Sequence, residues 1–369
     1  MRAVVISHTY VVAANRGKLE ALARAPGVEI KLLVPRHWTN RDIGQTLRAP
    51  STTHPFETAA LPAWSGGFAA LLTYSPFVLQ RALSVFRPDL VHLEEEPWSV
   101  AALEVALVCA RRRVPFIFFT WENSDRRLPP PFEWIRRAVT RRAAAAVAGN
   151  AEAKRLLEQR GFAGPVHVLP QLGVDPGMFF PAQPAGGPED PVVGFVGRLV
   201  PQKGLLVLLD AVARLPKRVR VLIVGDGPLR HAVRAHARLL GLEGCLELHG
   251  AVGHDAVATQ LRRMSVLVLP SLSAPTWNEQ FGHVLIEAMA CGVPVIGSDS
   301  GAIPAVIGEA GIVVREGDPA ALAGALGDLL SHPTRRIELA ARGRARVLAA
   351  YTNEAVAQQL LAAWRTVGS

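Results

Sequence analysis

Residues 270–301 read PSLSAPTWNEQFGHVLIEAMACGVPVIGSDSG. The apolar run before this stretch ends at Pro270, and the polar residues that follow indicate a loop. A helix is expected over residues 283–290, because they are almost all apolar and Gly292 supplies a stop signal. Residues 293–297 form the next expected strand. Strand, loop, helix and strand in this order predict a βαβ unit of a parallel sheet.

The same alternation extends over the whole chain, with short apolar runs separated by longer helical patterns. In the first half, strands are expected over residues 2–7, 28–34, 89–93, 114–120, 144–148 and 166–169. In the second half, they are expected over residues 192–196, 219–224, 246–249, 266–269, 293–297 and 312–314. Alternating strands and helices are typical of doubly wound parallel sheets. The sequence therefore predicts an α/β protein with two Rossmann-like domains.

Residues 173–191 separate the two sets of strands. Their proline and glycine content is the densest in the chain, which marks them as a linker. A chain of 369 residues has the length of two domains at roughly 150 residues each. The first domain is expected over residues 1–172 and the second over residues 192–350. A ligand is expected in the interdomain cleft, where the carboxyl ends of the two sets of strands face each other.

Composition excludes several classes of protein. Half of the residues are hydrophobic and 19% are charged, which rules out disorder of the whole chain. The three cysteines, Cys109, Cys245 and Cys291, are far apart, so neither a disulfide framework nor a zinc finger is indicated. The first ten residues, MRAVVISHTY, lack the apolar segment of a signal peptide, and the apolar stretches are too short to cross a bilayer. We expect a cytoplasmic protein, with peripheral contact to the inner face of the membrane as an open alternative.

The formal net charge of +9 is concentrated in one region. Residues 111–142 contain nine arginines against three acidic residues. Within this region, a basic helix is expected over residues 132–142, with its apolar residues on one face and arginines along the borders. The apolar residues of that face are Trp134, Ile135, Ala138 and Val139. The pattern fits a helix packed on its own domain with a solvated basic rim, and an interfacial helix on an anionic membrane is the alternative. Nucleic-acid binding is not expected, because no motif for it accompanies the charge.

Several catalytic motifs are absent from the sequence. No G-x-G-x-x-G motif follows a strand and no P-loop is present, which argues against a nicotinamide, flavin or P-loop nucleotide site. Neither a D-x-D pair nor an H-E-x-x-H motif occurs, so no set of metal ligands is indicated. Residues 297–301, GSDSG, have an aspartate where a nucleophile elbow requires a serine, which argues against a hydrolase.

A carboxylate lies in the middle of the helix expected over residues 283–290. Glu287 is surrounded there by apolar residues, and a buried carboxylate needs a hydrogen-bond donor. The hydroxyls of a ribose are a suitable pair of donors, and a structural salt bridge is the alternative. Glu279 precedes this helix in a loop that also contains Gly282. The helix N-terminus between the two glutamates is suited to a phosphate group.

A second informative stretch is VVGFVGRLVPQKG at residues 192–204. After the strand and Gly197, the cations Arg198 and Lys203 flank a loop that opens a helix expected over residues 203–215. Cations at the start of a helix oppose its dipole unless an anion lies among them. A diphosphate would satisfy this requirement, and two exposed surface cations are the alternative.

These two stretches together resemble a known family. GRLVPQKG at residues 197–204 and EQFGHVLIE at residues 279–287 resemble the donor-binding domain of the retaining glycosyltransferases of family 4, which have the GT-B architecture of two facing Rossmann-like domains. The resemblance implies that Arg198 and Lys203 neutralise a nucleotide diphosphate next to Gly197. It also implies that Glu287 holds the ribose, and that Glu279 contacts the donor sugar together with the backbone of Phe281 and Gly282.

The family's reaction follows from the resemblance as an expectation. It is transfer, with retained anomeric configuration, from a UDP- or GDP-linked sugar to a glycan or lipid-linked saccharide, as in polysaccharide biosynthesis. Cations and a helix N-terminus stabilise the leaving group, and no metal or other cofactor is implied. Residues 1–172 would form the acceptor-side domain. The nucleobase would lie in the second domain, near residues 245–250. Residues 351–369 would form a helix that crosses back to the first domain.

One departure from the family concerns the first domain. Many members have a histidine after its fourth strand, whereas this chain reads FTWEN at residues 119–123. Glu122 or Asn123 is expected to occupy that place, with a structural loop role as the alternative. His8, which follows the first strand, is a second candidate for lining the cleft, together with Gly17.

Two other functions remain open at this point. One is a nucleotide-sugar epimerase of the same architecture, against which the set of Arg198, Lys203, Glu279 and Glu287 argues. The other is a basic protein without catalytic activity that binds nucleic acid or a membrane, and it predicts steeply salt-dependent binding.

Overall fold

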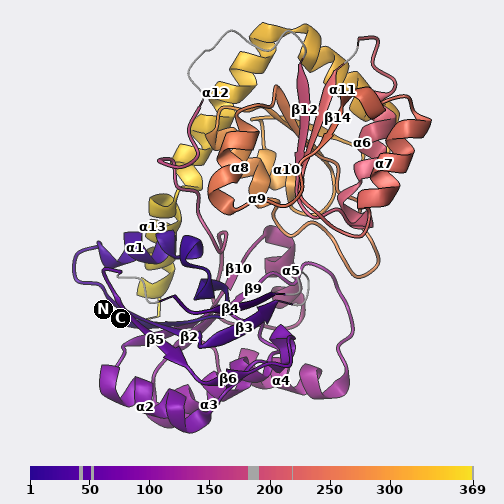
Figure 1. Ribbon diagram of the computed structural model, residues 1–369. Coiled ribbons are helices and arrows are strands. Elements are labelled where there is room, and N and C mark those ends of the chain that lie inside the picture. The colour runs from indigo at the N-terminus through magenta and orange to yellow at the C-terminus, as the bar shows by residue number, and fades with distance from the viewer. Residues whose placement is uncertain (41–44, 51–53, 182–190, 218, 368–369) are drawn as a thin grey trace. The chain divides into compact units, whose positions relative to one another are not determined.

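The computed structural model describes residues 1–40, 45–50, 54–181, 191–217 and 219–367. The chain forms two compact units (Figure 1). The first unit comprises Met1–Gly173 together with Asn353–Ser369, and the second comprises Val174–Thr352. Of the linker expected at residues 173–191, residues 182–190 lie outside the described residues. Each unit is built on its own parallel sheet.

The sheet of the first unit has seven parallel strands in the order β11-β10-β9-β8-β1-β2-β5. Its strands are β1 (Arg2–Ile6), β2 (Glu29–Pro35), β5 (Glu57–Leu61), β8 (Leu90–Leu93), β9 (Phe116–Thr120), β10 (Ala145–Ala148) and β11 (Val166–Val168). Every strand expected in this half is present. β5 was not expected, because it is an edge strand in which only Leu61 is buried, so its sequence lacks an apolar run.

Two short antiparallel hairpins accompany this sheet and were also not expected from the sequence. They pair β3 (His37–Asn40) with β4 (Gln45–Arg48) and β6 (Ala63–Trp64) with β7 (Thr73–Tyr74). Strands of two to four residues are too short to show a hydrophobic period, which is why the pattern gave no signal for them.

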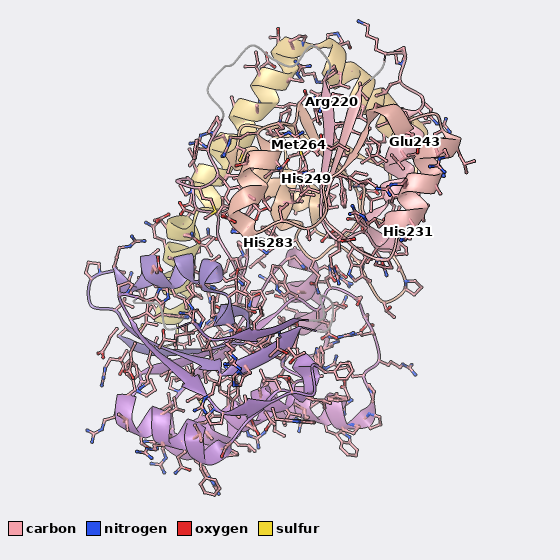
Figure 2. All side chains as sticks on the ribbon, viewed as in Figure 1. Arg220, His231, Glu243, His249, Met264 and His283 are labelled. Carbon is pink, nitrogen blue, oxygen red and sulfur yellow. The ribbon has the colours of Figure 1, made fainter. Side chains whose placement is uncertain are left out.

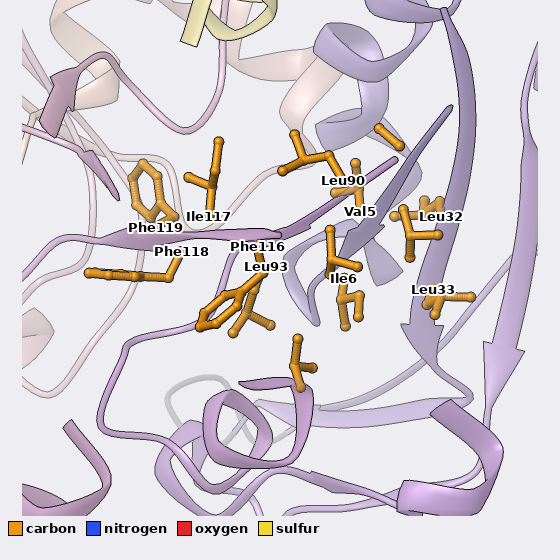
Figure 3. Packing of buried hydrophobic residues seen from close by; sticks show 14 of the residues in the cluster. Val5, Ile6, Leu32, Leu33, Leu90, Leu93, Phe116, Ile117, Phe118 and Phe119 are labelled. Atoms are coloured by element: carbon orange, nitrogen blue, oxygen red, sulfur yellow. The ribbon is translucent and has the colours of Figure 1, made fainter. Parts of the chain in front are cut away.

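Helices cover both faces of the first sheet. They are α1 (Gly17–Ala23), α2 (Pro76–Phe86), α3 (Val100–Arg112), α4 (Pro130–Thr140), α5 (Ala151–Gln159) and α13 (Asn353–Arg365). Three 3-10 turns span Thr9–Val11, Ala13–Arg16 and Ala69–Leu71. α1 packs against α13 on one face, while α2, α3 and α4 pack side by side on the other (Figure 1). Because both faces are covered, the central strands are buried along their whole length, and their side chains form the core shown in Figure 3.

The second unit has a six-stranded parallel sheet in the order β14-β13-β12-β15-β16-β17. Its strands are β12 (Val192–Val196), β13 (Arg220–Val224), β14 (Leu246–Leu248), β15 (Val266–Leu269), β16 (Val295–Ser298) and β17 (Ile312–Val314). All six were expected from the sequence. The chain enters this unit at Val174 and leaves it at Thr352, and a β-bridge joins these two residues.

The helices of the second unit also lie on both faces of its sheet. They are α6 (Leu205–Val212), α7 (Arg230–Leu239), α8 (His254–Leu261), α9 (His283–Ala290), α10 (Ile303–Ile307), α11 (Pro319–Ser331) and α12 (Pro333–Ala350), with 3-10 turns at Pro201–Lys203 and Glu243–Cys245. α6, α7 and α11 cover one face, and α8, α9 and α12 cover the other (Figure 1). The helix expected over 203–215 begins later, at Leu205, because Gly204 has a left-handed conformation that interrupts it. Within the described residues, no helix combines the length and hydropathy that crossing a membrane requires.

The strand orders locate a ligand-binding position in each unit. Numbered along the chain, the strands of the second sheet lie in the order 3-2-1-4-5-6, and those of the first sheet follow the same scheme with one added strand. The order reverses between β12 and β15 in the second unit and between β1 and β8 in the first. Ligands of open α/β sheets bind outside the carboxyl ends of the strands at such a reversal. Functional side chains are therefore expected at these two switch points.

The last helix is anchored in the first unit by a buried tryptophan. Trp364 of α13 is 0% exposed, and its Nε1 donates a hydrogen bond to Nδ1 of His92 on β8 at 3.0 Å. Burial lowers the pKa of His92, which fits a neutral ring that accepts this bond. The C-terminal segment is thereby part of the core of the first unit.

Trp364→Ala is predicted to lower the free energy of unfolding of the first unit by about 3–5 kcal/mol, because it leaves a large cavity and removes the bond to His92. Trp134→Ala is the control, since Trp134 is 68% exposed and its loss should change stability by less than about 0.5 kcal/mol. Chemical denaturation of the two variants and the wild type measures both effects. Equal stabilities of the two variants would contradict the anchoring role of Trp364.

Candidate active site

The loops after β12 and β15 meet at the switch point of the second unit. After β12 come Gly197, the exposed Arg198 and the 3-10 turn that ends at Lys203. Gly204 then adopts φ +66°, and a Cβ atom there would lie 1.9 Å from the carbonyl oxygen of Pro270. Only glycine allows this approach, which brings the loop after β12 against the loop after β15.

Lys203 and Glu279, which are 76 positions apart, form an ion pair at this point. Lys203 Nζ lies 2.5 Å from Glu279 Oε2, and the Ser271 hydroxyl donates to the same oxygen at 2.7 Å. Glu279 is only 6% exposed. The ammonium of Lys203 also lies 5.5 Å from the ring centroid of Trp277. Two residues expected to act on the donor are thus brought together, and Lys203 gives the buried Glu279 the partner that burial requires.

The backbone of Glu279 is fixed as firmly as its side chain. Its carbonyl oxygen accepts a hydrogen bond from the N–H of Ala302 at 2.9 Å. A Cβ atom at Gly301, whose φ is +55°, would lie 2.1 Å from that carbonyl oxygen. The SGAIP segment after β16 therefore helps to hold Glu279 in place.

Glu287 is partnered by a histidine of the neighbouring helix. His254 Nε2 lies 3.1 Å from Glu287 Oε1, and the carboxylate side chain is 15% exposed. The hydrogen bond to Glu287 raises the pKa of His254 above 6.5. The salt bridge considered as the alternative for Glu287 is thus present, with His254 as the partner. The carboxylate of Glu287 remains partly accessible.

Phe281 and Gly282 begin the same helix. Gly282 caps α9 with φ +79°, and Phe281 is buried against His283 and Tyr351. Burial lowers the pKa of His283, although the nearby carboxylates of Glu287 and Glu279 oppose this shift. Figure 2 shows His283 at the start of α9, whereas the exposed His231 lies on α7 of the opposite face. The switch point therefore combines a lysine, an exposed arginine, a helix N-terminus and two carboxylates, a set that can bind an anion and hydroxyl groups.

The switch point of the first unit is built around three consecutive glutamates that directly follow β8. Glu94 is fully buried, with Lys18 Nζ at 2.6 Å and the Tyr10 hydroxyl at 2.7 Å. Burial by itself would raise the pKa of Glu94, but Lys18 and His92 lower it to about 2. Glu94 is therefore ionised and paired within the protein.

Glu95 and Glu96 line a pocket beside this pair. His8, predicted to line the site, lies there: its Nδ1 is 2.7 Å from Glu95, and its backbone N–H donates to Glu95 Oε1 at 2.8 Å. Glu96 accepts hydrogen bonds from the Thr120 hydroxyl at 2.6 Å and from the Trp121 N–H at 2.8 Å. Sequence reasoning missed these glutamates, although EEE directly after an expected strand was a usable signal, because such residues gather at the carboxyl edge of a parallel sheet.

The structure places the other first-domain candidates away from this pocket. Glu122 is buried among arginines, with Arg160 Nη1 at 2.8 Å and Arg126 and Arg136 both at 3.8 Å. Asn123 is also buried beside it. Gly17 starts α1 where a Cβ atom would overlap the side chain of Asn353. Glu122 and Gly17 thus have structural partners here.

Trp134 differs from the expectation for the basic helix. It was expected on one face with Val139, but Val139 is fully buried while Trp134 is exposed. The reason is that α4 packs on α3 through a narrower stripe than the pattern indicated. Across the described ranges, no group of three or more histidine, cysteine, aspartate or glutamate residues is arranged to hold a metal ion.

Two family models and several known proteins match this chain. Residues 12–171 match the glycosyl transferase 4-like domain, and residues 190–332 match glycosyl transferases group 1. The phosphatidyl-myo-inositol mannosyltransferase of Mycobacterium leprae is 30% identical over 95% of this chain and 92% of its own length. The chain belongs to the glycosyl transferases group 1 family.

Other similarities to this group 1 chain are partial in sequence or limited to the fold. The D-inositol 3-phosphate glycosyltransferase of Segniliparus rotundus is 34% identical over 54% of this chain. The chain spans 46% of that protein's length, so about half. HepE of Anabaena, whose crystal structure contains UDP, is 18% identical, with a TM-score of 0.75 over 99% of this chain and 100% of HepE. This similarity confirms the expected GT-B fold with two Rossmann-like domains.

In this group 1 glycosyltransferase, Glu287→Gln is predicted to lower the pKa of His254 toward 6.5, because the variant removes the negative charge that favours the protonated ring. Since the folded-state pKa is raised, the pair stabilises the fold below pH 6.5, and this contribution is lost as the pH rises through the raised value. Titration of the His254 ring signal by NMR measures the shift. Glu243→Gln, which breaks an exposed pair with Arg238 instead, should leave the His254 titration unchanged.

Proposed function

We propose that this glycosyltransferase moves a hexosyl group from a nucleotide-diphosphate sugar to a hydroxyl of a glycan or lipid-linked saccharide, with retained anomeric configuration and without a metal. The observation that carries the proposal is the arrangement of Arg198 and the Lys203–Glu279 pair at the switch point of the second unit. Cations at this position are suited to a diphosphate, the anionic part of such a donor.

The donor diphosphate is assigned to the two cations and the start of α9. Lys203 has three N–H donors, of which Glu279 occupies one, so the others remain available to phosphate oxygens. Arg198 lies on the same loop and is exposed. The start of α9, next to Gly282, is the positive end of the helix dipole and favours an anion.

The remaining parts of the donor are assigned to neighbouring residues. The partly accessible carboxylate of Glu287 accepts hydrogen bonds from the ribose hydroxyls and keeps its contact with His254. Glu279 and the backbone of Phe281 and Gly282 contact the sugar. The nucleobase is assigned to the end of β14, where His249 and Gln260 are hydrogen-bonded to each other at 3.2 Å.

Catalysis in this proposal depends on stabilising the leaving group. The bond between the anomeric carbon and the β-phosphate oxygen breaks, and its electron pair stays on the diphosphate. The acceptor oxygen forms the new bond to the anomeric carbon on the same face and gives its proton to a phosphate oxygen of the leaving group. Arg198, Lys203 and the α9 N-terminus stabilise the negative charge that develops, which is the role a metal ion has in other transferases.

The names of similar proteins support a hexosyl donor and leave its base open. The M. leprae relative is a mannosyltransferase, and the HepE structure contains UDP. UDP and GDP are therefore both candidates for the nucleotide part of the donor. An epimerase of the same architecture would convert the donor without an acceptor, so product analysis separates it from a transferase.

Glu287→Ala is predicted to weaken binding of the nucleoside diphosphate, whereas Glu279→Ala is predicted mainly to lower turnover. The measurement is the thermal stability of each variant with UDP, GDP or ADP in the presence of a chelator, followed by transfer assays. A nucleotide at about 100 times its Kd should stabilise the wild type by about 2.7 kcal/mol, and Glu287→Ala should lose this gain.

Glu243→Ala is the matched control, because it removes a carboxylate of the same unit that pairs with Arg238 on the surface. It should respond to the nucleotide as the wild type does. Unchanged binding and turnover in both Glu287→Ala and Glu279→Ala would refute the site assignment. A strict requirement for added Mg²⁺ or Mn²⁺ would refute the metal-free mechanism.

We also propose that the face of the first unit formed by α2, α3 and α4 contacts an anionic membrane. Large apolar side chains are exposed on all three helices: Phe77, Val85, Leu107 and Trp134. Arginines lie among them: Arg137 of α4 and Arg141, the C-cap residue of α4, follow Trp134 by three and seven positions. Exposed apolar residues within a basic surface are typical of interfacial membrane binding.

Trp134→Ala combined with Arg141→Ala is predicted to reduce binding to vesicles that contain an anionic lipid by at least tenfold, because it removes both the apolar and the electrostatic contact. Vesicle co-sedimentation at low and high salt measures the change. Leu239→Ala is the control, since Leu239 is 84% exposed on α7 of the second unit. Equal binding of neutral and anionic vesicles by the wild type would contradict this partner.

A further inference from the structure

A cavity of the first unit lies between α4 and the segment that follows α5. Its volume is about 680 Å³, within the range of roughly 300–1,000 Å³ that is usual for small-molecule sites. The lining residues after α4 lead into β10, and those after α5 lead into β11, so this part of the cavity lies toward the amino ends of these strands. The pocket of Glu95 and Glu96 lies at the carboxyl ends and shares no lining residue with it. The cavity is therefore separate from the switch point.

The charged side chains that line this cavity are four arginines and one glutamate. They are Arg136, Arg137, Arg141, Arg160 and Glu133. Their formal charges sum to 4 − 1 = +3. A concave surface lined mainly by cations attracts anions.

Carboxylates behind the wall neutralise only part of this charge. Arg160 pairs with Glu122 at 2.8 Å and with Asp125 at 2.9 Å. Arg126, which does not line the cavity, lies 3.8 Å from Glu122. When these three groups are added to the lining residues, five arginines face three carboxylates, and the formal charge is 5 − 3 = +2. The cavity thus keeps a positive charge after its ion pairs are counted.

Two of the four arginines are held in place by the protein. The side chain of Arg136 is 12% exposed and that of Arg160 is 18% exposed. Nη2 of Arg136 lies 2.5 Å from Glu133, whereas its Nη1 is buried and has no hydrogen-bond partner within the described residues. A buried N–H group without a partner calls for an acceptor. Because these guanidinium groups are already ordered, a ligand would bind them at a lower entropic cost.

The other two arginines are exposed and retain most of their donors. Arg137 donates from Nε to Glu133 at 2.9 Å, and Arg141 forms no ion pair within the described residues. A guanidinium group has five N–H donors in a planar fork, which matches the oxygens of a phosphate group. Such charge-assisted pairs of hydrogen bonds are stronger than bonds between neutral groups.

The one carboxylate that lines the cavity is already stabilised in its ionised form. Burial by itself would raise the pKa of Glu133, but the hydrogen bonds from Arg136 and Arg137 lower it. The wall of the cavity therefore favours negative charge at this position.

From this arrangement we infer that the cavity binds a phosphomonoester group, either of a soluble phosphorylated molecule or of a lipid headgroup. A phosphomonoester carries a charge of about −1.5 to −2 at pH 7, which matches the charge that the ion pairs leave, whereas a phosphodiester carries one negative charge. The inference goes beyond the proposed transfer, because no donor-site residue lines the cavity. It also differs from the proposed membrane contact, which requires only an anionic surface and no particular headgroup.

The first arm of the test uses a soluble probe, fructose 1,6-bisphosphate, and measures its Kd by calorimetry on the full chain. Arg137→Gln combined with Arg141→Gln is expected to weaken binding by roughly tenfold or more, because the variant removes two charged donors from the cavity. Both side chains are exposed, so the variant should fold as the wild type does.

The second arm uses vesicles of equal surface charge that contain either phosphatidic acid, a phosphomonoester, or phosphatidylglycerol, a phosphodiester. If the ligand is a lipid headgroup, the wild type should bind the phosphatidic acid vesicles at least about tenfold more tightly, and Arg137→Gln with Arg141→Gln should remove this preference. Binding in the first arm indicates a soluble ligand, and a preference in the second arm alone indicates a lipid. Either result supports the site.

Arg81→Gln combined with Arg111→Gln is the matched control. It removes the same charge from exposed positions on α2 and α3 that do not line the cavity. This variant should keep the affinity for the soluble probe and the preference between vesicles. Equal losses in the two double variants would overturn the inference, because they would indicate a general effect of net charge. The absence of both soluble binding and a vesicle preference in the wild type would also overturn it.

Discussion

A lysine–glutamate pair with a buried glutamate joins the two sides of the switch point in each sheet. In the first unit, Lys18 after β1 pairs with Glu94 after β8 at 2.6 Å, and in the second, Lys203 after β12 pairs with Glu279 after β15 at 2.5 Å. A buried charge must keep its partner, because leaving one charge alone is strongly destabilising. Each pair therefore fixes the separation of the two segments that follow these strands at the carboxyl edge of the sheet, and the neighbouring side chains of the site take their positions from those segments.

The surroundings of the two pairs differ in their charged groups. In the second unit, Arg198 and the start of α9 lie next to the pair and favour an anion. In the first unit, Glu95 and Glu96 directly follow Glu94 and line a pocket together with His8. Function depends on these local side chains, since the fold alone is shared by proteins of many activities.

The first site also depends on the far end of the chain. Trp364 of α13 donates a hydrogen bond to His92, and the other ring nitrogen of His92 lies 3.3 Å from Glu94. α13 therefore helps to position Glu94 of the Lys18–Glu94 pair. Glu122 also has a structural role, because its carboxylate lies among the guanidinium groups of Arg126, Arg136 and Arg160. Some of the arginines of residues 111–142 therefore pair with a buried carboxylate. Others, including Arg137 and Arg141, are exposed near Trp134.

The sequence by itself determined the α/β class, the strands of both parallel sheets apart from β5, the helix that carries Glu287 and the family resemblance. These features are written in short windows, where apolar runs and glycine stops reflect burial and turns directly. Only the tertiary structure decided the edge strand β5 and the partners of Lys203, Glu122 and Glu287. It also decided that Glu95 and Glu96 lie together with His8. Such pairs join residues far apart along the chain, and which of them meet depends on the order in which strands lie side by side. No local window contains that order, because it results from the packing of the whole sheet.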